Sequence, residues 1–202
     1  MKRVIVYIDG FNLYYGLREK GWKWAYWLNL SALAQALIPD GYMLVRTKYF
    51  TSIVTSPPNK HDRQNEFLEA LHTLPELDIF FGLFLDHPVT CPRCNLTYLV
   101  HGEKMTDVNI AVQALTDAHL NLYDRAILIS ADSDLTGMIR AVRNVYEKSV
   151  IVAFPPKRWS NELKQAANGI IHIGRTDLSK SLFPDEVIKP DGFILRRPKT
   201  WQ

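Results

Sequence analysis

The sequence predicts an α/β fold, with a mostly parallel central sheet between two layers of helices. Short apolar runs rich in β-branched residues alternate along the chain with stretches of helical periodicity, an order that is typical of such folds. The runs lack the polar–apolar alternation of a half-exposed strand, so both of their faces are expected to be buried. The 202 residues are enough for one domain that buries about 70% of its unfolded surface.

Six strands and five helices are expected. The predicted strands cover residues 4–8, 43–53, 78–85, 126–129, 150–154 and 170–173. The predicted helices cover residues 31–38, 60–74, 104–120, 135–146 and 161–167. Ser31 is the predicted N-cap of the first helix, and Pro75 closes the second. The third helix is apolar nearly all round, which predicts a buried position.

The domain organisation follows from these elements. Residues 1–175 are predicted to form one domain, in which residues 86–103 are an inserted hairpin, and residues 176–202 a C-terminal extension. The two cysteines cannot form a disulfide framework, and the first apolar run is too short for a signal peptide or a membrane span. We therefore expect a cytoplasmic protein with no membrane contact. The net charge of +3 is too small to identify a nucleic-acid binder.

Acidic residues follow two of the predicted strands directly. Asp9 ends the first strand, with Asn12 just beyond it, and Asp132 and Asp134 follow the strand at 126–129. Ligand sites of parallel sheets lie at the carboxyl ends of the strands, so these groups converge if the two strands are neighbours. Asp107 lies in the first turn of the most apolar helix, where the helix dipole favours a negative charge.

Carboxylates crowded in this way repel one another unless a cation binds between them or their pKa values rise. Hard oxygen ligands select Mg²⁺ or Mn²⁺, and such ions hold substrate phosphates, which indicates phosphodiester chemistry. The alternative is that each aspartate only caps a helix, as Asp134 before Leu135 would do.

Three segments, taken in order, resemble the signatures of the NYN-domain family, and the LabA-like group is the most similar. They are Asp9-Gly-Phe-Asn12, Glu103-Lys-Met-Thr-Asp107-Val and Ile129-Ser-Ala-Asp132-Ser-Asp134-Leu. Ser160 and Leu163 also resemble the opening of the last helix of the family, so the resemblance covers about residues 3–175.

The resemblance implies a PIN-like three-layer α/β/α fold and a divalent-metal-dependent ribonuclease, a hydrolase acting on RNA. It places the following residues at the positions of the catalytic site: Asp9, Asn12, Asp107, Asp132 and Asp134. A catalytically silent RNA-binding or regulatory module of the same fold is the alternative function. A phosphatase acting on small phosphate esters is a third.

The chain departs from the family pattern at Ala131, Leu135 and Gln113. Gln113 stands where many relatives carry another aspartate, which leaves one or two metal ions as open alternatives. Asp117 is no replacement, because it lies about 15 Å along the helix from Asp107.

The Cys91-Pro-Arg-Cys94 turn is half of a zinc-ribbon pattern, for which His87 and His101 are the nearby further ligands. A structural zinc ion, bare thiols or a vestigial site, and redox chemistry of the two thiols are the open interpretations.

Aromatic and basic residues offer candidate RNA contacts. The six aromatic residues Tyr14, Tyr15, Trp22, Trp24, Tyr26 and Trp27 cluster near the N-terminus. They belong either to the core or a subunit interface of a homo-oligomer, or to a surface on which single-stranded bases stack. Lys157 and Arg158 are candidate phosphate ligands. Lys104 either neutralises charge on a bound phosphate or pairs with Glu103.

Overall fold

A computed structural model describes the backbone of residues 1–202 and the side chains of all but residues 84–87 and 99–103. Its main sheet has six strands, all paired in parallel, in the order β3-β2-β1-β6-β7-β8. These strands are β1 (Lys2–Asp9), β2 (Tyr42–Thr51), β3 (Leu77–Phe81), β6 (Arg125–Ile129), β7 (Ser149–Phe154) and β8 (Gly169–His172). The predicted parallel sheet is confirmed.

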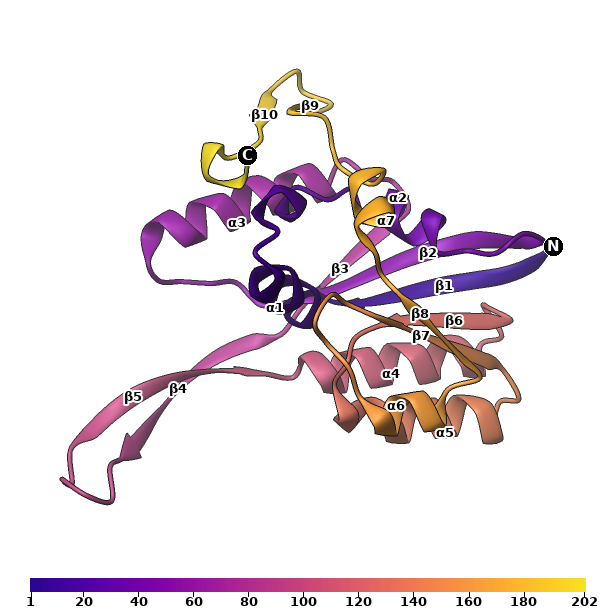
Figure 1. The fold of residues 1–202 in the computed structure, drawn as a ribbon, viewed down its shortest axis with the longest axis horizontal. Helices are drawn as coiled ribbons and strands as arrows, with labels where there is room; N and C mark the ends of the chain where they lie inside the picture. Colours follow the sequence, from indigo (N-terminus) through magenta and orange to yellow (C-terminus); the bar gives the residue numbers. More distant parts are fainter.

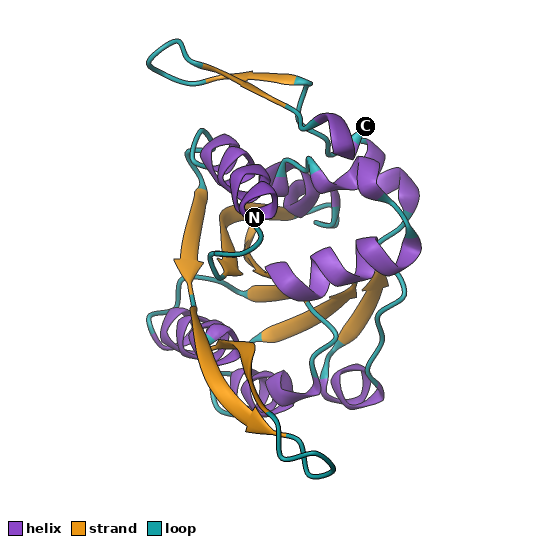
Figure 2. Cartoon of the chain, turned by 90° about the vertical axis from the view of Figure 1, so that its left-hand side faces the viewer, coloured by secondary structure: helices purple, strands orange, loops and turns teal.

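Helices cover both faces of this sheet (Figures 1 and 2). One face carries α1 (Gly10–Lys20), α2 (Leu30–Ala36), α3 (Pro58–Leu71) and α7 (Arg175–Ser179), whose apolar side chains share one core cluster. The other face carries α4 (Thr106–His119), α5 (Thr136–Asn144) and α6 (Asn161–Ala166), which share a second cluster. Three short 3₁₀ helices complete this part: η1 (Lys23–Tyr26), η2 (Ser133–Leu135) and η3 (Lys199–Trp201). The predicted three-layer fold is therefore confirmed.

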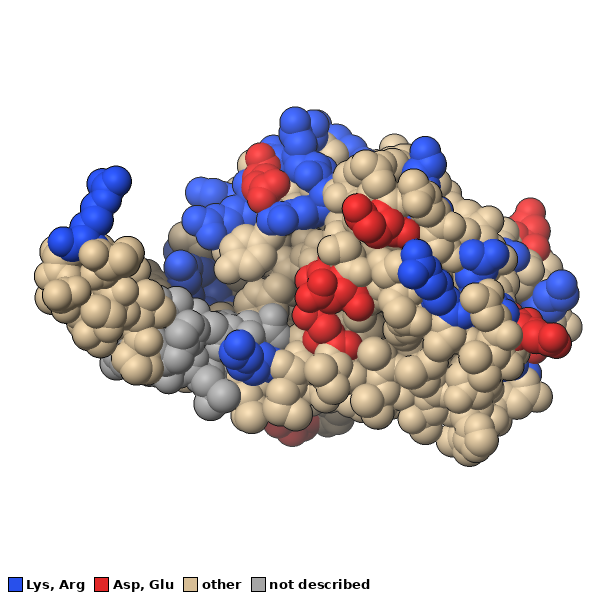
Figure 3. Space-filling model, turned by 90° about the horizontal axis from the view of Figure 1, so that it is seen from below, with Lys and Arg blue, Asp and Glu red and all other residues tan. Residues whose placement is uncertain are grey.

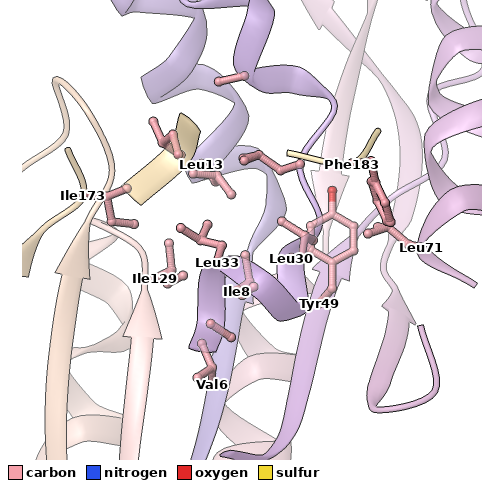
Figure 4. Packing of buried hydrophobic residues seen from close by; sticks show 14 of the residues in the cluster. Val6, Ile8, Leu13, Leu30, Leu33, Tyr49, Leu71, Ile129, Ile173 and Phe183 are labelled. Atoms are coloured by element: carbon pink, nitrogen blue, oxygen red, sulfur yellow. The ribbon is translucent and has the colours of Figure 1, made fainter. Parts of the chain in front are cut away.

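The central strand β1 shows why the first apolar run does not alternate. Val6 and Ile8 belong to the cluster under α1 and α2, as Figure 4 shows, whereas Ile5 and Tyr7 belong to the cluster under α4 and α5. Successive side chains of a strand point to opposite faces, and here both faces are covered. Every residue from Val4 to Ile8 is therefore buried.

Two predicted elements begin or end elsewhere in the structure. The N-cap of α2 is Asn29 rather than Ser31, because the Oδ1 atom of Asn29 accepts the N–H of Ala32 at 2.9 Å. Helix α1 has no counterpart among the predicted helices. It is capped by Asp9 at its start and ended by Gly21, whose φ of 73° suits glycine.

The predicted strand at residues 78–85 is divided at Gly82. β3 ends at Phe81, and β4 (Leu83–Thr90) leaves the sheet to pair with β5 (Thr97–Lys104) in an antiparallel hairpin. The hairpin extends from the body of the molecule (Figure 1). A Cβ atom on Gly82 would lie 2.7 Å from the carbonyl oxygen of Lys104, so the two chains can cross closely only at a glycine.

Residues 176–202 pack on the layer that contains α1 to α3. They form the end of α7, the small hairpin of β9 (Glu186–Ile188) and β10 (Ile194–Arg196), and η3. Phe183 and Leu195 belong to the core cluster of that layer, and the indole N–H of Trp27 donates to the carbonyl oxygen of Pro184 at 2.8 Å. Among the described residues, no helix has the length and apolar character needed to cross a membrane.

Candidate metal centre

The acidic residues lie at the carboxyl edge of the sheet, where two central strands end together. β1 and β6 are parallel neighbours, with Ile8 paired to Ile129. Asp9 is the last residue of β1, and Asp132 follows β6 by three residues. The two strands that end in acidic residues are therefore neighbours, as the predicted convergence of these residues requires.

Asp9 is buried, with only 3% of its surface exposed. Its Oδ1 atom accepts the backbone N–H of Asn12 at 2.9 Å, and its Oδ2 atom accepts the Ser130 hydroxyl at 2.9 Å. Burial raises the pKa of Asp9, the hydrogen bonds from Asn12 and Ser130 lower it, and the charge of Asp132 raises it further. Asp9 therefore caps α1 and lies in the acidic site at the same time.

Ser130 lies within the third sequence motif and positions two of the acidic residues, a role that the sequence did not predict. It is fully buried, it donates to Asp9, and its Oγ atom accepts the backbone N–H of Asp132 at 3.0 Å. One hydroxyl thus links the aspartate of β1 to the turn after β6. A small hydroxyl residue directly after a buried strand, two positions before an aspartate, is the signal that could have identified it.

Asn12 and Asp132 organise the same turn. The Oδ1 atom of Asn12 accepts the N–H of Ala131 at 3.1 Å, and the Oδ1 atom of Asp132 accepts the N–H of Asp134 at 3.0 Å. The residue that caps η2 is thus Asp132, whereas Asp134 is exposed within the short helix.

Asp107 shares the electrostatic field of the other three carboxylates. It is half-buried in the first turn of α4, and its pKa is raised to about 6, first by burial and then by the charges of Asp132, Asp9 and Asp134. Lys104, the nearest candidate cation in the sequence, is exposed and has no ion pair within the described part of the chain. Figure 3 shows a group of acidic side chains near the middle of the face that it views.

The donor set suits a hard divalent cation in its chemistry. All four acidic groups offer oxygen. Burial and then mutual repulsion raise the pKa of Asp107, and a bound cation would lower it again. No three His, Cys, Asp or Glu side chains among the described residues are arranged to hold an ion on their own. Mg²⁺ commonly binds one or two carboxylates and keeps several waters, so such a set is compatible with it.

Asp117 lies away from this site, as the sequence analysis expected. Its carboxylate is 2.7 Å from Lys48 Nζ and accepts the Tyr7 hydroxyl at 2.7 Å, inside the core between β1, β2 and α4. Gln113 accepts from the same ammonium group at 2.9 Å. Gln113, one of the positions at which the chain departs from the expected family pattern, therefore belongs to a buried network around Lys48.

The two predicted phosphate ligands after β7 differ from each other. Lys157 is exposed, with a left-handed φ of 61°. Arg158 pairs with Glu19 at 2.5 Å and lies over the Tyr15 ring at 5.8 Å, so its charge is already partly neutralised within the protein.

The two cysteines form the turn at the tip of the β4–β5 hairpin. Both are free thiols, and the pKa of Cys91 is lowered, mainly by the backbone N–H groups of Arg93 and Cys94. Backbone donors that stabilise a thiolate suit a metal-binding turn. The side chains of His87 and His101, the expected further ligands, lie outside the described residues.

The aromatic cluster divides between the core and a pocket. Trp27 is fully buried, whereas Tyr14, Tyr15 and Tyr26 line a cavity of about 470 Å³ between α1, η1, α3 and η3. Part of the cluster thus belongs to the core, and base stacking on the exposed rings stays a prediction.

Comparison with known proteins agrees with this architecture. The NYN domain matches residues 3–174. The 6-hydroxy-3-succinoylpyridine 3-monooxygenase HspA of Pseudomonas putida is 26% identical over 98% of this chain and 75% of its own length. A crystal structure of a protein of unknown function from Vibrio parahaemolyticus is 19% identical, with a TM-score of 0.59 over 90% of this chain and 96% of that one. This last likeness shows the fold alone.

Proposed function

Since this chain belongs to the NYN domain family, we propose that it is a divalent-metal-dependent ribonuclease, of the LabA-like group, that hydrolyses RNA phosphodiester bonds. The observation that carries the proposal is the shared electrostatic field of four carboxylates at the carboxyl edge of β1 and β6, where burial and then the charges of Asp132, Asp9 and Asp134 raise the pKa of Asp107 to about 6. Such a field favours a cation, and a cation at this edge can hold a phosphate.

The roles of the residues follow from their contacts. Of the four acids Asp9, Asp107, Asp132 and Asp134, one or two would bind Mg²⁺ or Mn²⁺ directly, and the others would act through waters of the ion. When bound, the ion supplies charge stabilisation for the scissile phosphate and a water of lowered pKa. Ser130 and Asn12 act as positioning residues, because each hydrogen-bonds a group of the acidic edge.

The test is a cleavage assay with single-stranded and structured RNA in Mn²⁺ or Mg²⁺, against EDTA. Asp132→Asn keeps the Oδ1 acceptor for the Asp134 N–H and removes the charge, so it should abolish cleavage. The matched control is Asp40→Asn, an exposed aspartate next to Gly41, whose carbonyl oxygen accepts from the start of β1 at the opposite edge of the sheet. Cleavage by the Asp132→Asn protein at the wild-type rate would refute this assignment of the site.

A catalytically silent RNA-binding module makes a different prediction. The wild-type protein would bind RNA without cutting it under any metal, and Asp132→Asn would leave the affinity nearly unchanged. The same preparations distinguish the two functions when binding and cleavage are measured side by side.

A second candidate function comes from the Pseudomonas relative, whose name describes oxygenation of a substituted pyridine. The observation that favours it is the 470 Å³ pocket, which combines aromatic walls with arginine and lysine side chains. Oxygen consumption with 6-hydroxy-3-succinoylpyridine and a nicotinamide reductant, with and without added flavin, tests it. Absence of turnover with that substrate would exclude this specific activity.

A further inference from the structure

The cavity beside α1 has the features of a ligand site and lies outside the acidic cluster. We infer that it binds one nucleotide of the RNA strand, with the base among its aromatic side chains and the phosphate against its cations. The identity of the ligand rests on the proposed function. The volume of about 470 Å³ lies within the range of pockets that hold small ligands.

Aromatic rings from four elements of the chain form its walls. Tyr14 of α1 and Tyr26 of η1 have ring centroids 5.1 Å apart, and Trp201 of η3 lies 5.6 Å from Tyr26. Phe67 of α3 lies 6.3 Å from Trp201, and Figure 1 shows α1, α3 and the C-terminal end near one another. Tyr14 is 37% exposed, so part of this wall is open to a ligand. Rings of this kind stack on bases with little regard to sequence.

The charged residues that line the pocket are all basic. Arg18, Lys23, Lys60 and Arg63 line it, and none of its described lining residues is acidic. No acid pairs with any of these four cations in the part of the chain that the structure describes. The N-terminal end of α3, which includes Lys60, adds the positive end of its helix dipole. The positive charges of these side chains would therefore stabilise a bound anion.

The pocket adjoins the acidic edge of the sheet. Its lining includes Gly10, which follows Asp9 directly, and Thr51, the last residue of β2. Tyr49 on the pocket floor lies close enough to Asp9 for that charge to contribute to its raised pKa, which burial brings to about 12. Figure 4 shows the hydroxyl of Tyr49 pointing up from its strand. A strand whose phosphate lies at the acids can thus place a neighbouring nucleotide in the pocket.

The spread of the cations favours a nucleotide over a free aromatic acid. Arg18 comes from α1, Lys23 from η1, and Lys60 and Arg63 from α3. One carboxylate can contact only one or two of these groups, whereas successive phosphates of a strand can use all of them. The pocket therefore fits part of a polyanion better than a small monoanion.

The experiment measures binding of uridine and adenosine 5′-monophosphates to the whole protein in EDTA, by calorimetry and tryptophan fluorescence. Arg18→Ala combined with Arg63→Ala should weaken binding by at least about tenfold, because hydrogen bonds to charged groups are the stronger ones. The control, Lys20→Ala with Lys180→Ala, removes two exposed cations that do not line the pocket and should leave binding unchanged.

The aromatic contribution has its own pair of variants. Tyr14→Ala should weaken nucleotide binding by about tenfold, as expected for the loss of one stacking ring. Tyr98→Ala removes a tyrosine that is 51% exposed on the hairpin and should have no effect. Both substitutions are at exposed positions, so a loss of binding reports on the pocket rather than on folding.

Three results would overturn the inference. In the first, nucleosides bind as tightly as their monophosphates. In the second, the control variants lose as much affinity as the pocket variants. In the third, a pyridine carboxylate binds more tightly than the nucleotides. Because these measurements need no metal, they are independent of the cleavage assay. If the protein binds nucleotides but does not cut RNA, only the proposed ribonuclease function is refuted. If it cuts RNA but does not bind nucleotides, only the inference about the pocket is refuted.

Discussion

Replacing Asp107 by asparagine should stabilise the metal-free protein. Asp107 is half-buried, and the charges of Asp132, Asp9 and Asp134 act on it in addition to its burial. Asparagine has the same shape without the charge, so the cost of burying the charge and the repulsion from the other carboxylates, which together raise the pKa of Asp107, both disappear.

The structure indicates the size of this gain. A rise in pKa from 3.8 to about 6 corresponds to about 3 kcal/mol if the group were fully shielded from solvent. Solvent screening of a half-buried group reduces this to roughly half. The helix dipole of α4 favours the carboxylate by about 0.3–1 kcal/mol, which opposes the gain. The net stabilisation is about 1 kcal/mol, or about 2–4 °C in melting temperature for a chain of this size.

Thermal and urea unfolding in EDTA at neutral pH measure the effect, with Asp40→Asn as the exposed control. With Mn²⁺ added, the wild-type protein should become more stable than the variant, because the wild-type protein gains more stability from the bound ion. A loss of about 1 kcal/mol in the metal-free Asp107→Asn protein would show that Asp107 serves mainly as a helix-capping residue and would refute the electrostatic argument.

Three further outcomes test other parts of the structure. Lys48→Met should destabilise the protein by about 3–5 kcal/mol in urea unfolding, because it leaves the Asp117 carboxylate buried without its cation; Lys180→Met is the exposed control. Arg3 lowers the pKa of Asp124 from 3.8 to about 2, so this aspartate contributes stability that is fully present above pH 3.8 and is lost as the pH falls through about 2. Asp124→Asn should thus lower the melting temperature clearly at pH 7 and by much less at pH 2, where about half of the Asp124 carboxylates are already protonated. The turn at residues 91–94 should carry about one zinc ion per chain in elemental analysis of protein purified without added metal; less than about a tenth of that, with no change in melting temperature on chelation, would favour bare thiols.

The sequence alone predicted the sheet because strands that are buried on both faces appear in the sequence as short runs of apolar residues. In β1 the residues from Val4 to Ile8 are all apolar and buried, and β6 and β7 contain similar apolar runs at residues 126–129 and 150–154. The candidate site was predictable for the same reason, since Asp9 and Asp132 follow strands that a parallel sheet brings side by side. Ser130 escaped the prediction because its role depends on a hydrogen bond to Asp9, 121 residues away.

Other features depend on contacts between distant segments. Helix α1 has little apolar periodicity, and its position depends on Gly10, where a Cβ atom would lie 2.7 Å from the Phe50 carbonyl oxygen. The pocket combines η1 with Trp201, and no local pattern links segments that lie so far apart in the chain. Local propensity and periodicity are properties of neighbouring residues, so the sequence by itself determined the strands, most helices and the acidic motifs. Only tertiary packing decided which charges meet a partner in the core and which surround an open cavity, because burial and pairing depend on elements that meet only in the folded chain.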